Sequence, residues 1–196
     1  MQQVIQNSKI EISIQKSRFI SYCEKFTTPE SIKKRIQELK EEYPGANHVC
    51  YAWRLISEEG LLTYRFADDG EPSGTAGKPI LNFLEGEEVV NAAVFVVRFF
   101  GGIKLGSGGL VKAYGQSSRD AILAAELKPW KKLFQLSATT SYENLRQVEY
   151  LIGKQPELEI LEKEFGVDVK IKIQGIKEEE ESIKNTLNPF LNFEEN

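Results

Sequence analysis

The sequence predicts an α+β protein made of two units, and three patterns in it carry that prediction. Apolar and polar residues alternate over residues 10–14 and again over residues 167–174, which is the period of half-buried strands. Apolar residues at spacings of four, three and four, from Ile32 to Tyr43, indicate an amphipathic helix. Residues 89–100 are almost continuously apolar, as expected of a central strand that is covered on both faces.

The first half of the chain is expected to form an α/β sandwich. Residues 18–26 can return as the hairpin partner of the first strand, and Thr28 is the expected N-cap of a helix with Pro29 at its first position. Pro44 and Gly45 end that helix. The following elements are expected in chain order: strands at 48–57 and 61–66, a short helix ending at Gly86, a strand at 89–100, and a helix after the glycine-rich loop 101–109.

A boundary is expected near Pro129, which divides the chain into domains 1–128 and 129–196. The second domain shows a strand at 133–139, a helix from Tyr142, a strand near Ile160, a strand at 167–174 and a last helix ending near Leu187. The order strand, helix, strand, strand, helix is most of a ferredoxin-like unit.

Composition narrows the classes of protein. No apolar run approaches the about 18 residues of a membrane span, and the N-terminal residues lack the pattern of a signal peptide. We therefore expect a cytoplasmic protein without a membrane partner, in which Cys23 and Cys50 are reduced thiols. The net charge of −4 argues against coating of nucleic acid by bulk charge.

One segment departs from this acidic average. No Asp or Glu occurs between Glu88 and Asp120, and the charged residues there are Arg98, Lys104, Lys112 and Arg119. The loop GGIKLGSGG, with Gly106, Ser107 and Gly108 near its end, lies between a buried strand and a helix N-terminus, where backbone N–H groups can bind an anion. A tight strand-to-helix connection explains the glycines equally well.

A second loop, DDGEPSGTAGKP at residues 68–79, is rich in polar side chains. Its candidate functional residues are Asp68, Asp69, Gly70, Glu71, Pro72, Ser73, Gly74, Thr75, Gly77 and Lys78. The three carboxylates could hold Mg²⁺, and Lys78 and the two hydroxyls could contact a phosphate. Ordinary turn chemistry is the alternative, but so long a constrained loop favours a functional surface.

The sequence gives little support for a catalytic site. His48 is the single histidine, which excludes a zinc site built on two histidines. A His48–Cys50 pair lacks a third group to orient it, so a histidine beside a core cysteine is the preferred interpretation. We expect no catalytic residue and no bound cofactor.

The motifs DDGEPSGTAGKPIL and RFFGGIKLGSGGLVKAYGQS, together with SRFI and HVCYAWR upstream, closely resemble the YigZ/IMPACT family. The resemblance implies an N-terminal domain similar to the second domain of a small-subunit ribosomal protein, and a C-terminal domain similar to the ferredoxin-like domains of elongation factor G. Eukaryotic relatives regulate translation by binding a scaffold protein that activates a stress kinase. They use in part an additional N-terminal domain that this sequence does not show.

The sequence and the resemblance together favour a non-enzymatic, monomeric, translation-associated protein that binds RNA or a ribosomal or translation-factor partner. The residues expected to contact phosphate are Lys78, Arg98, Lys104, Gly106, Ser107, Gly108, Lys112 and Arg119. The alternative is an enzyme or sensor that binds a phosphorylated small molecule or nucleotide with Mg²⁺. The stretch LGSGG at residues 105–109 lies where GHMP kinases, as the family's fold relatives, carry their phosphate loop.

Overall fold

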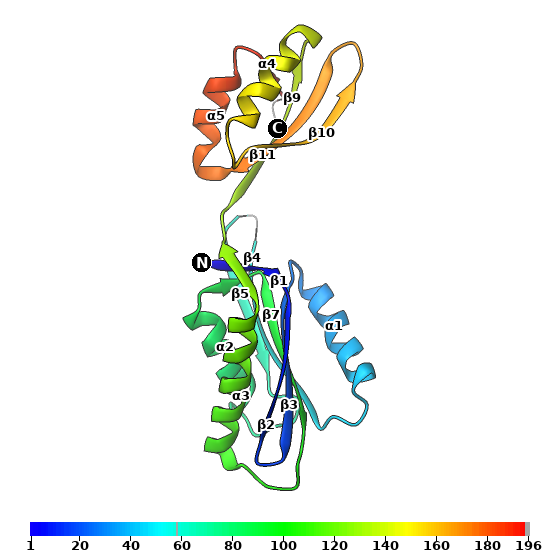
Figure 1. Ribbon diagram of the computed structural model, residues 1–196, viewed down its shortest axis with the longest axis vertical. Coiled ribbons are helices and arrows are strands. Elements are labelled where there is room, and N and C mark those ends of the chain that lie inside the picture. Colours follow the sequence, from blue (N-terminus) through cyan, green and yellow to red (C-terminus); the bar gives the residue numbers. More distant parts are fainter. Residues whose placement is uncertain (58, 195–196) are drawn as a thin grey trace. The chain divides into compact units, whose positions relative to one another are not determined.

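A computed structural model describes residues 1–57 and 59–194, and the chain divides into two compact units, Met1–Trp130 and Lys131–Asn196 (Figure 1). We call these the N-terminal and C-terminal units. None of the helices formed by the described residues is long and apolar enough to cross a membrane.

The N-terminal unit is built on a five-stranded antiparallel sheet with strand order β2-β3-β7-β4-β5. Its strands are β2 (Ser8–Ile14), β3 (Ser17–Lys25), β4 (His48–Ile56), β5 (Leu62–Ala67) and β7 (Ala92–Phe99). The hairpin of β2 and β3 and the central position of the apolar strand confirm what the sequence predicts.

Helices cover both faces of this sheet (Figure 1). Helix α1 (Pro29–Glu42) packs on one face through Ile32 and Leu39. Helices α2 (Gly77–Gly86) and α3 (Gly106–Ala124) pack on the other face. Successive β7 side chains point to opposite faces and enter the two cores in turn, which explains the continuous apolar run.

Helix α1 begins as predicted, since the Thr28 hydroxyl oxygen accepts a hydrogen bond from the backbone N–H of Ser31. The single strand expected over 89–100 is wrong, because Asn91 adopts a positive φ of 52° and interrupts it. The residues before this break form β6 (Val89–Val90), in a small sheet with β1 (Gln2–Gln6) and β8 (Glu126–Pro129).

The C-terminal unit has the βαββαβ order of a ferredoxin-like fold. Its elements are β9 (Leu133–Thr140), α4 (Tyr142–Gly153), β10 (Glu159–Phe165), β11 (Val169–Ile176), α5 (Glu180–Leu187) and β12 (Asn192–Phe193). The antiparallel sheet has the order β10-β11-β9-β12, and α4 and α5 share one core with its apolar face. Val167, expected in a strand, lies in the preceding turn and is 97% exposed.

Candidate functional site

The candidate site lies at the end of the five-stranded sheet where β4 begins and β7 ends. His48, the first residue of β4, pairs directly with Arg98 near the end of β7. The loop that follows β5 reaches the same end because β5 runs antiparallel to β4, and the glycine-rich loop reaches it because it follows β7. The sheet register thus brings together the two loops that the sequence singles out.

A cavity of about 380 Å³ opens between the two loops. It is lined by Asn47, His48, Glu71, Pro72, Arg98, Phe100, Lys104, Leu105, Gly106, Ser107 and Leu110. Its volume lies within the range of about 300–1,000 Å³ that is usual for small-ligand pockets. Residues from both loops therefore face one common hollow, which we call the loop cavity.

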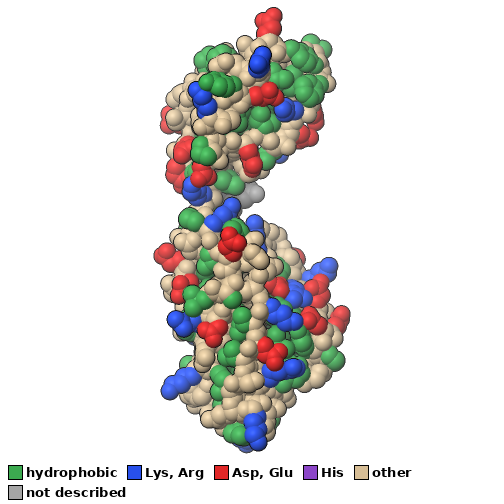
Figure 2. Space-filling model, in the orientation of Figure 1, with side chains coloured by type: hydrophobic (Ala, Val, Ile, Leu, Met, Phe, Trp, Pro, Cys, Tyr) green, Lys and Arg blue, Asp and Glu red, His purple; other side chains and the backbone are tan. Residues whose placement is uncertain are grey.

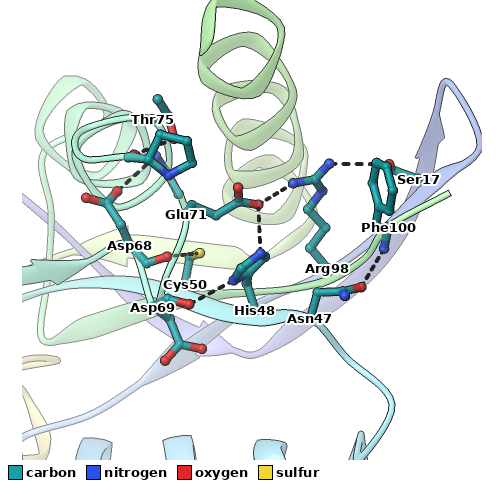
Figure 3. A network of polar contacts seen from close by, with 12 residues as sticks. Ser17, Asn47, His48, Cys50, Asp68, Asp69, Glu71, Thr75, Arg98 and Phe100 are labelled. Atoms are coloured by element: carbon teal, nitrogen blue, oxygen red, sulfur yellow. Dashed lines mark hydrogen bonds and ion pairs between the residues drawn. The ribbon is translucent and has the colours of Figure 1, made fainter. Parts of the chain in front are cut away.

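The Glu71 carboxylate is the centre of a polar network in the wall of the loop cavity (Figure 3). Its Oε1 atom forms a buried ion pair with Nη1 of Arg98 and accepts a hydrogen bond of 2.8 Å from the Tyr114 hydroxyl. The His48 Nε2 atom lies 3.8 Å from the same oxygen. The Glu71 and Arg98 side chains are only 4% and 7% exposed, so each charge depends on the other for compensation.

The imidazole of His48 is held by the loop at residues 68–79. Its Nδ1 atom lies 2.8 Å from the carbonyl oxygen of Asp69, which can only accept a hydrogen bond, so Nδ1 carries a proton. This contact directs Nε2 toward Glu71 (Figure 3). His48 is thus a positioned member of the network, and Cys50 is not its partner.

The two aspartates of the loop are used to fix its shape. Asp68 accepts hydrogen bonds from the backbone N–H groups of Gly74, Ala76 and Gly77, at 2.8 to 3.0 Å. Asp69 pairs with Lys40 at 2.7 Å and accepts from the backbone N–H of Val49 at 2.7 Å. The loop is therefore tied to α1, β4 and the start of α2.

The Mg²⁺ interpretation gains no support from this geometry. Asp68, Asp69 and Glu71 point to different partners, and within residues 1–57 and 59–194 no three His, Cys, Asp or Glu side chains form a group that could hold a metal. The Thr75 hydroxyl donates to the Pro72 carbonyl at 2.6 Å, and Ser73 is exposed.

The basic candidates divide into two groups. Arg98 is buried against Glu71, and Lys78 pairs with Glu85 at 3.5 Å. Lys104, Lys112 and Arg119 are exposed and form no ion pair with any residue that the structure describes. Lys104 lines the loop cavity. Lys112 and Arg119, seven residues apart on α3, share one side of that helix.

The expected helix N-terminus after the glycine-rich loop is present, and Gly106, Ser107 and Gly108 are the first residues of α3. Gly106 has a positive φ of 70°, which glycine adopts without strain. Gly106 and Ser107 line the loop cavity, so the unpaired N–H groups of the first turn lie beside it.

The sequence does not reveal Asn47, Phe100 and Tyr114 as members of the site. It also predicts His48 only as a histidine beside Cys50, whereas its ring contacts Asp69 and Glu71. Asn47 accepts a hydrogen bond from the backbone N–H of Phe100 at 2.8 Å, which fixes the chain where β7 ends. Phe100 and Tyr114 lie within the motif RFFGGIKLGSGGLVKAYGQS, but nothing in that motif relates them to Glu71. Only the pairing of β4 with β7 and the packing of α3 bring them to Glu71.

Both thiols are expected to resist modification in the folded protein. Burial raises the pKa of Cys23 to about 12 and also raises the pKa of Cys50, whose Sγ atom donates to the Asp68 carbonyl at 3.0 Å. Because only the thiolate reacts readily, neither cysteine should react with Ellman's reagent at pH 8, whereas both should react in guanidinium chloride. Rapid release of one equivalent of thionitrobenzoate from the native protein would contradict this.

The fold and the site define a class of protein: two-unit α+β proteins with a ferredoxin-like second unit, and with a cavity at one end of the first sheet whose wall holds a buried Glu–Arg pair. The family model described as "Impact N-terminal domain" matches residues 15–122. The chain belongs to the IMPACT family, as the sequence motifs predict.

Relatives and a solved structure agree with this assignment. An IMPACT family member of Haemophilus influenzae is 39% identical over 86% of this chain and 81% of its own length. The IMPACT family member YigZ of Escherichia coli is 38% identical over 72% of this chain and 69% of its own length. A crystal structure described only as that of a hypothetical protein has a TM-score of 0.66 and 30% identity, and it covers 98% of this chain and 95% of that one.

Proposed function

We propose that this chain is a non-enzymatic, translation-associated regulatory protein of the cytoplasm, and that it binds RNA at the loop cavity and along α3. The observation that carries the proposal is the placement of exposed cations without acidic partners. Lys104 lies at the cavity, and Lys112 and Arg119 continue along the helix that begins there. The translational role is supported by membership of the IMPACT family.

The distribution of charge favours RNA binding through a few local contacts over attraction of RNA by the net charge of the protein. On the face shown in Figure 2, acidic and basic side chains are interspersed. The segment between Glu88 and Asp120 is the longest stretch of the sequence without Asp or Glu, and three of its four cations are exposed. Phosphate contacts from these side chains would supply affinity and position without reading sequence.

Replacing Lys104 and Lys112 with alanine is expected to weaken RNA binding and to reduce its salt dependence. Each phosphate contact with a single strand contributes about 0.7 to the slope of log K against log salt concentration, so the double variant should lose about 1.4. Filter binding of a 20-nucleotide RNA at several concentrations of KCl measures this slope.

The matched control is Lys33→Ala with Lys34→Ala, since both lysines are exposed on α1, which covers the opposite face of the sheet. It removes the same charge and should leave the slope unchanged. Equal slopes for the two double variants would show that RNA does not use this site. A ribosomal or translation-factor protein would then be the partner to test.

One observation favours a second candidate, a phosphorylated small molecule. The first turn of α3 borders a cavity of ligand size, and the N-terminus of a helix attracts anions. Stabilisation of the chain in a thermal-shift assay by a nucleotide, with no binding of RNA, would support this candidate.

A further inference from the structure

We infer that the loop cavity receives one unpaired nucleobase of a single-stranded RNA, and that this base carries an exocyclic amino group. The inference rests on the proposed function and adds the class of RNA and the way in which it is held. It follows from three features of the cavity: an exposed aromatic ring, an unpaired carboxylate oxygen and a cationic rim.

The aromatic ring belongs to Phe100. This side chain is 44% exposed although it lies beside a cavity and directly after a buried strand. Asn47 fixes its backbone, and the Arg98 guanidinium lies 5.7 Å from its ring centroid. A positioned, exposed aromatic ring at a cavity provides a face on which an unstacked base can lie.

The carboxylate oxygen is Oε2 of Glu71. Oε1 takes all the contacts that Glu71 makes with Arg98, Tyr114 and His48, whereas Oε2 accepts no hydrogen bond from any described side chain or backbone group. Figure 3 shows this second oxygen without a contact. Oε2 is not among the buried side-chain atoms that lack a partner, so a ligand can reach it, and a ligand that supplies an N–H group would be favoured there.

The Glu71 carboxylate also determines which part of a nucleotide can bind in the loop cavity. A phosphate in contact with Glu71 would be repelled, while an amino group of cytosine, adenine or guanine is a donor that a carboxylate accepts. Uracil has a carbonyl oxygen in place of the amino group, and its one N–H donor on that edge is flanked by two carbonyl oxygens, which a carboxylate repels. The cavity should therefore discriminate against uracil.

The positive charge at the edge of the loop cavity favours a position of the RNA backbone at that edge, outside the cavity. Lys104 and the first turn of α3 border the same cavity, and both favour phosphate. A base directed toward Glu71 with its phosphate at Lys104 satisfies both charges. A duplex cannot offer this arrangement because its bases are paired and stacked.

Fluorescence anisotropy with labelled ten-nucleotide oligo(C), oligo(A) and oligo(U) and a ten-base-pair RNA duplex tests the inference. We expect oligo(C) and oligo(A) to bind at least about fivefold more tightly than oligo(U) and the duplex. Phe100→Ala should weaken oligo(C) binding by about five- to 150-fold, as removal of base stacking does, and Phe100→Tyr should restore it. Glu71→Gln, checked for native near-ultraviolet circular dichroism, should reduce the preference over oligo(U).

Phe165→Ala is the matched control, since Phe165 is an exposed aromatic residue of the C-terminal unit. Equal affinity of Phe100→Ala and Phe165→Ala for oligo(C), or duplex binding as tight as single-strand binding, would overturn the inference. The proposed function would survive that result if the Lys104 and Lys112 double variant still lost affinity. If the wild-type chain binds none of these RNAs, both proposals are wrong.

Discussion

Replacement of Arg98 by alanine is expected to lower the free energy of unfolding of the N-terminal unit by about 3–5 kcal/mol, because it leaves a buried carboxylate without its cation. The Arg98 side chain is 7% exposed and pairs with Glu71, which is 4% exposed. The guanidinium also lies 5.6 Å from the ring centroid of Phe19, so the substitution removes packing as well as charge.

Urea denaturation followed by tryptophan fluorescence measures this loss. The chain has two tryptophans, Trp53 and Trp130, and both belong to the N-terminal unit, so the signal reports on that unit alone. Lys34→Ala is the control, since Lys34 forms an exposed pair with Glu38 at 3.8 Å and should contribute less than about 1 kcal/mol. Similar denaturation midpoints for the two variants would show that the Glu71–Arg98 pair does not stabilise the fold.

This expectation changes the role of Arg98. The sequence places it among four cations of an acid-free segment and predicts a contact with phosphate. Its partner Glu71 comes from the other loop, 27 residues away, and is brought to it by the β4–β7 register and the turn at Asp69. Binding experiments on Arg98 variants would mix loss of contact with loss of fold, which is why Lys104 and Lys112 are the residues to test.

The sequence predicts those elements whose signals are local. Helix α1 has its cap at Thr28, a proline at its first position and an apolar stripe, and these act within one segment. The short strands β1 and β12 escape prediction because their pairing partners are distant in the chain, as when Gln2 pairs with both Val89 and Pro129. Their strand character is a property of the sheet more than of their own residues.

The candidate site, like the fold, has features that local sequence predicts and features that depend on residues distant in the chain. The composition of the two loops marks them as unusual, and the structure brings both to the loop cavity. What each side chain does there could not be predicted, because a carboxylate in a loop can bind a metal, a cation or backbone N–H groups with equal chemical plausibility. Asp68, Asp69 and Glu71 take the second and third of these partners.

Asp68→Ala is expected to destabilise the N-terminal unit by about 2–4 kcal/mol, since it removes one acceptor from three backbone donors. The N–H groups of Ala76 and Gly77 lie at the start of α2, where Ala76 offers no side-chain cap of its own, so Asp68 performs that task from eight and nine residues away. The negative charge also lies at the positive end of the helix dipole.

The same urea titration measures this effect, with Ser73→Ala as the control because Ser73 is exposed in the same loop and forms no hydrogen bond with the described residues. Asp68→Asn separates charge from geometry: its amide oxygen can accept from the same N–H groups, so a smaller loss is expected. Loosening this loop should also displace Glu71 and the carbonyl of Asp69 that holds His48. If Asp68→Ala is as stable as Ser73→Ala, the loop does not depend on its carboxylate, and the wall of the loop cavity is held by Arg98 and Tyr114 alone.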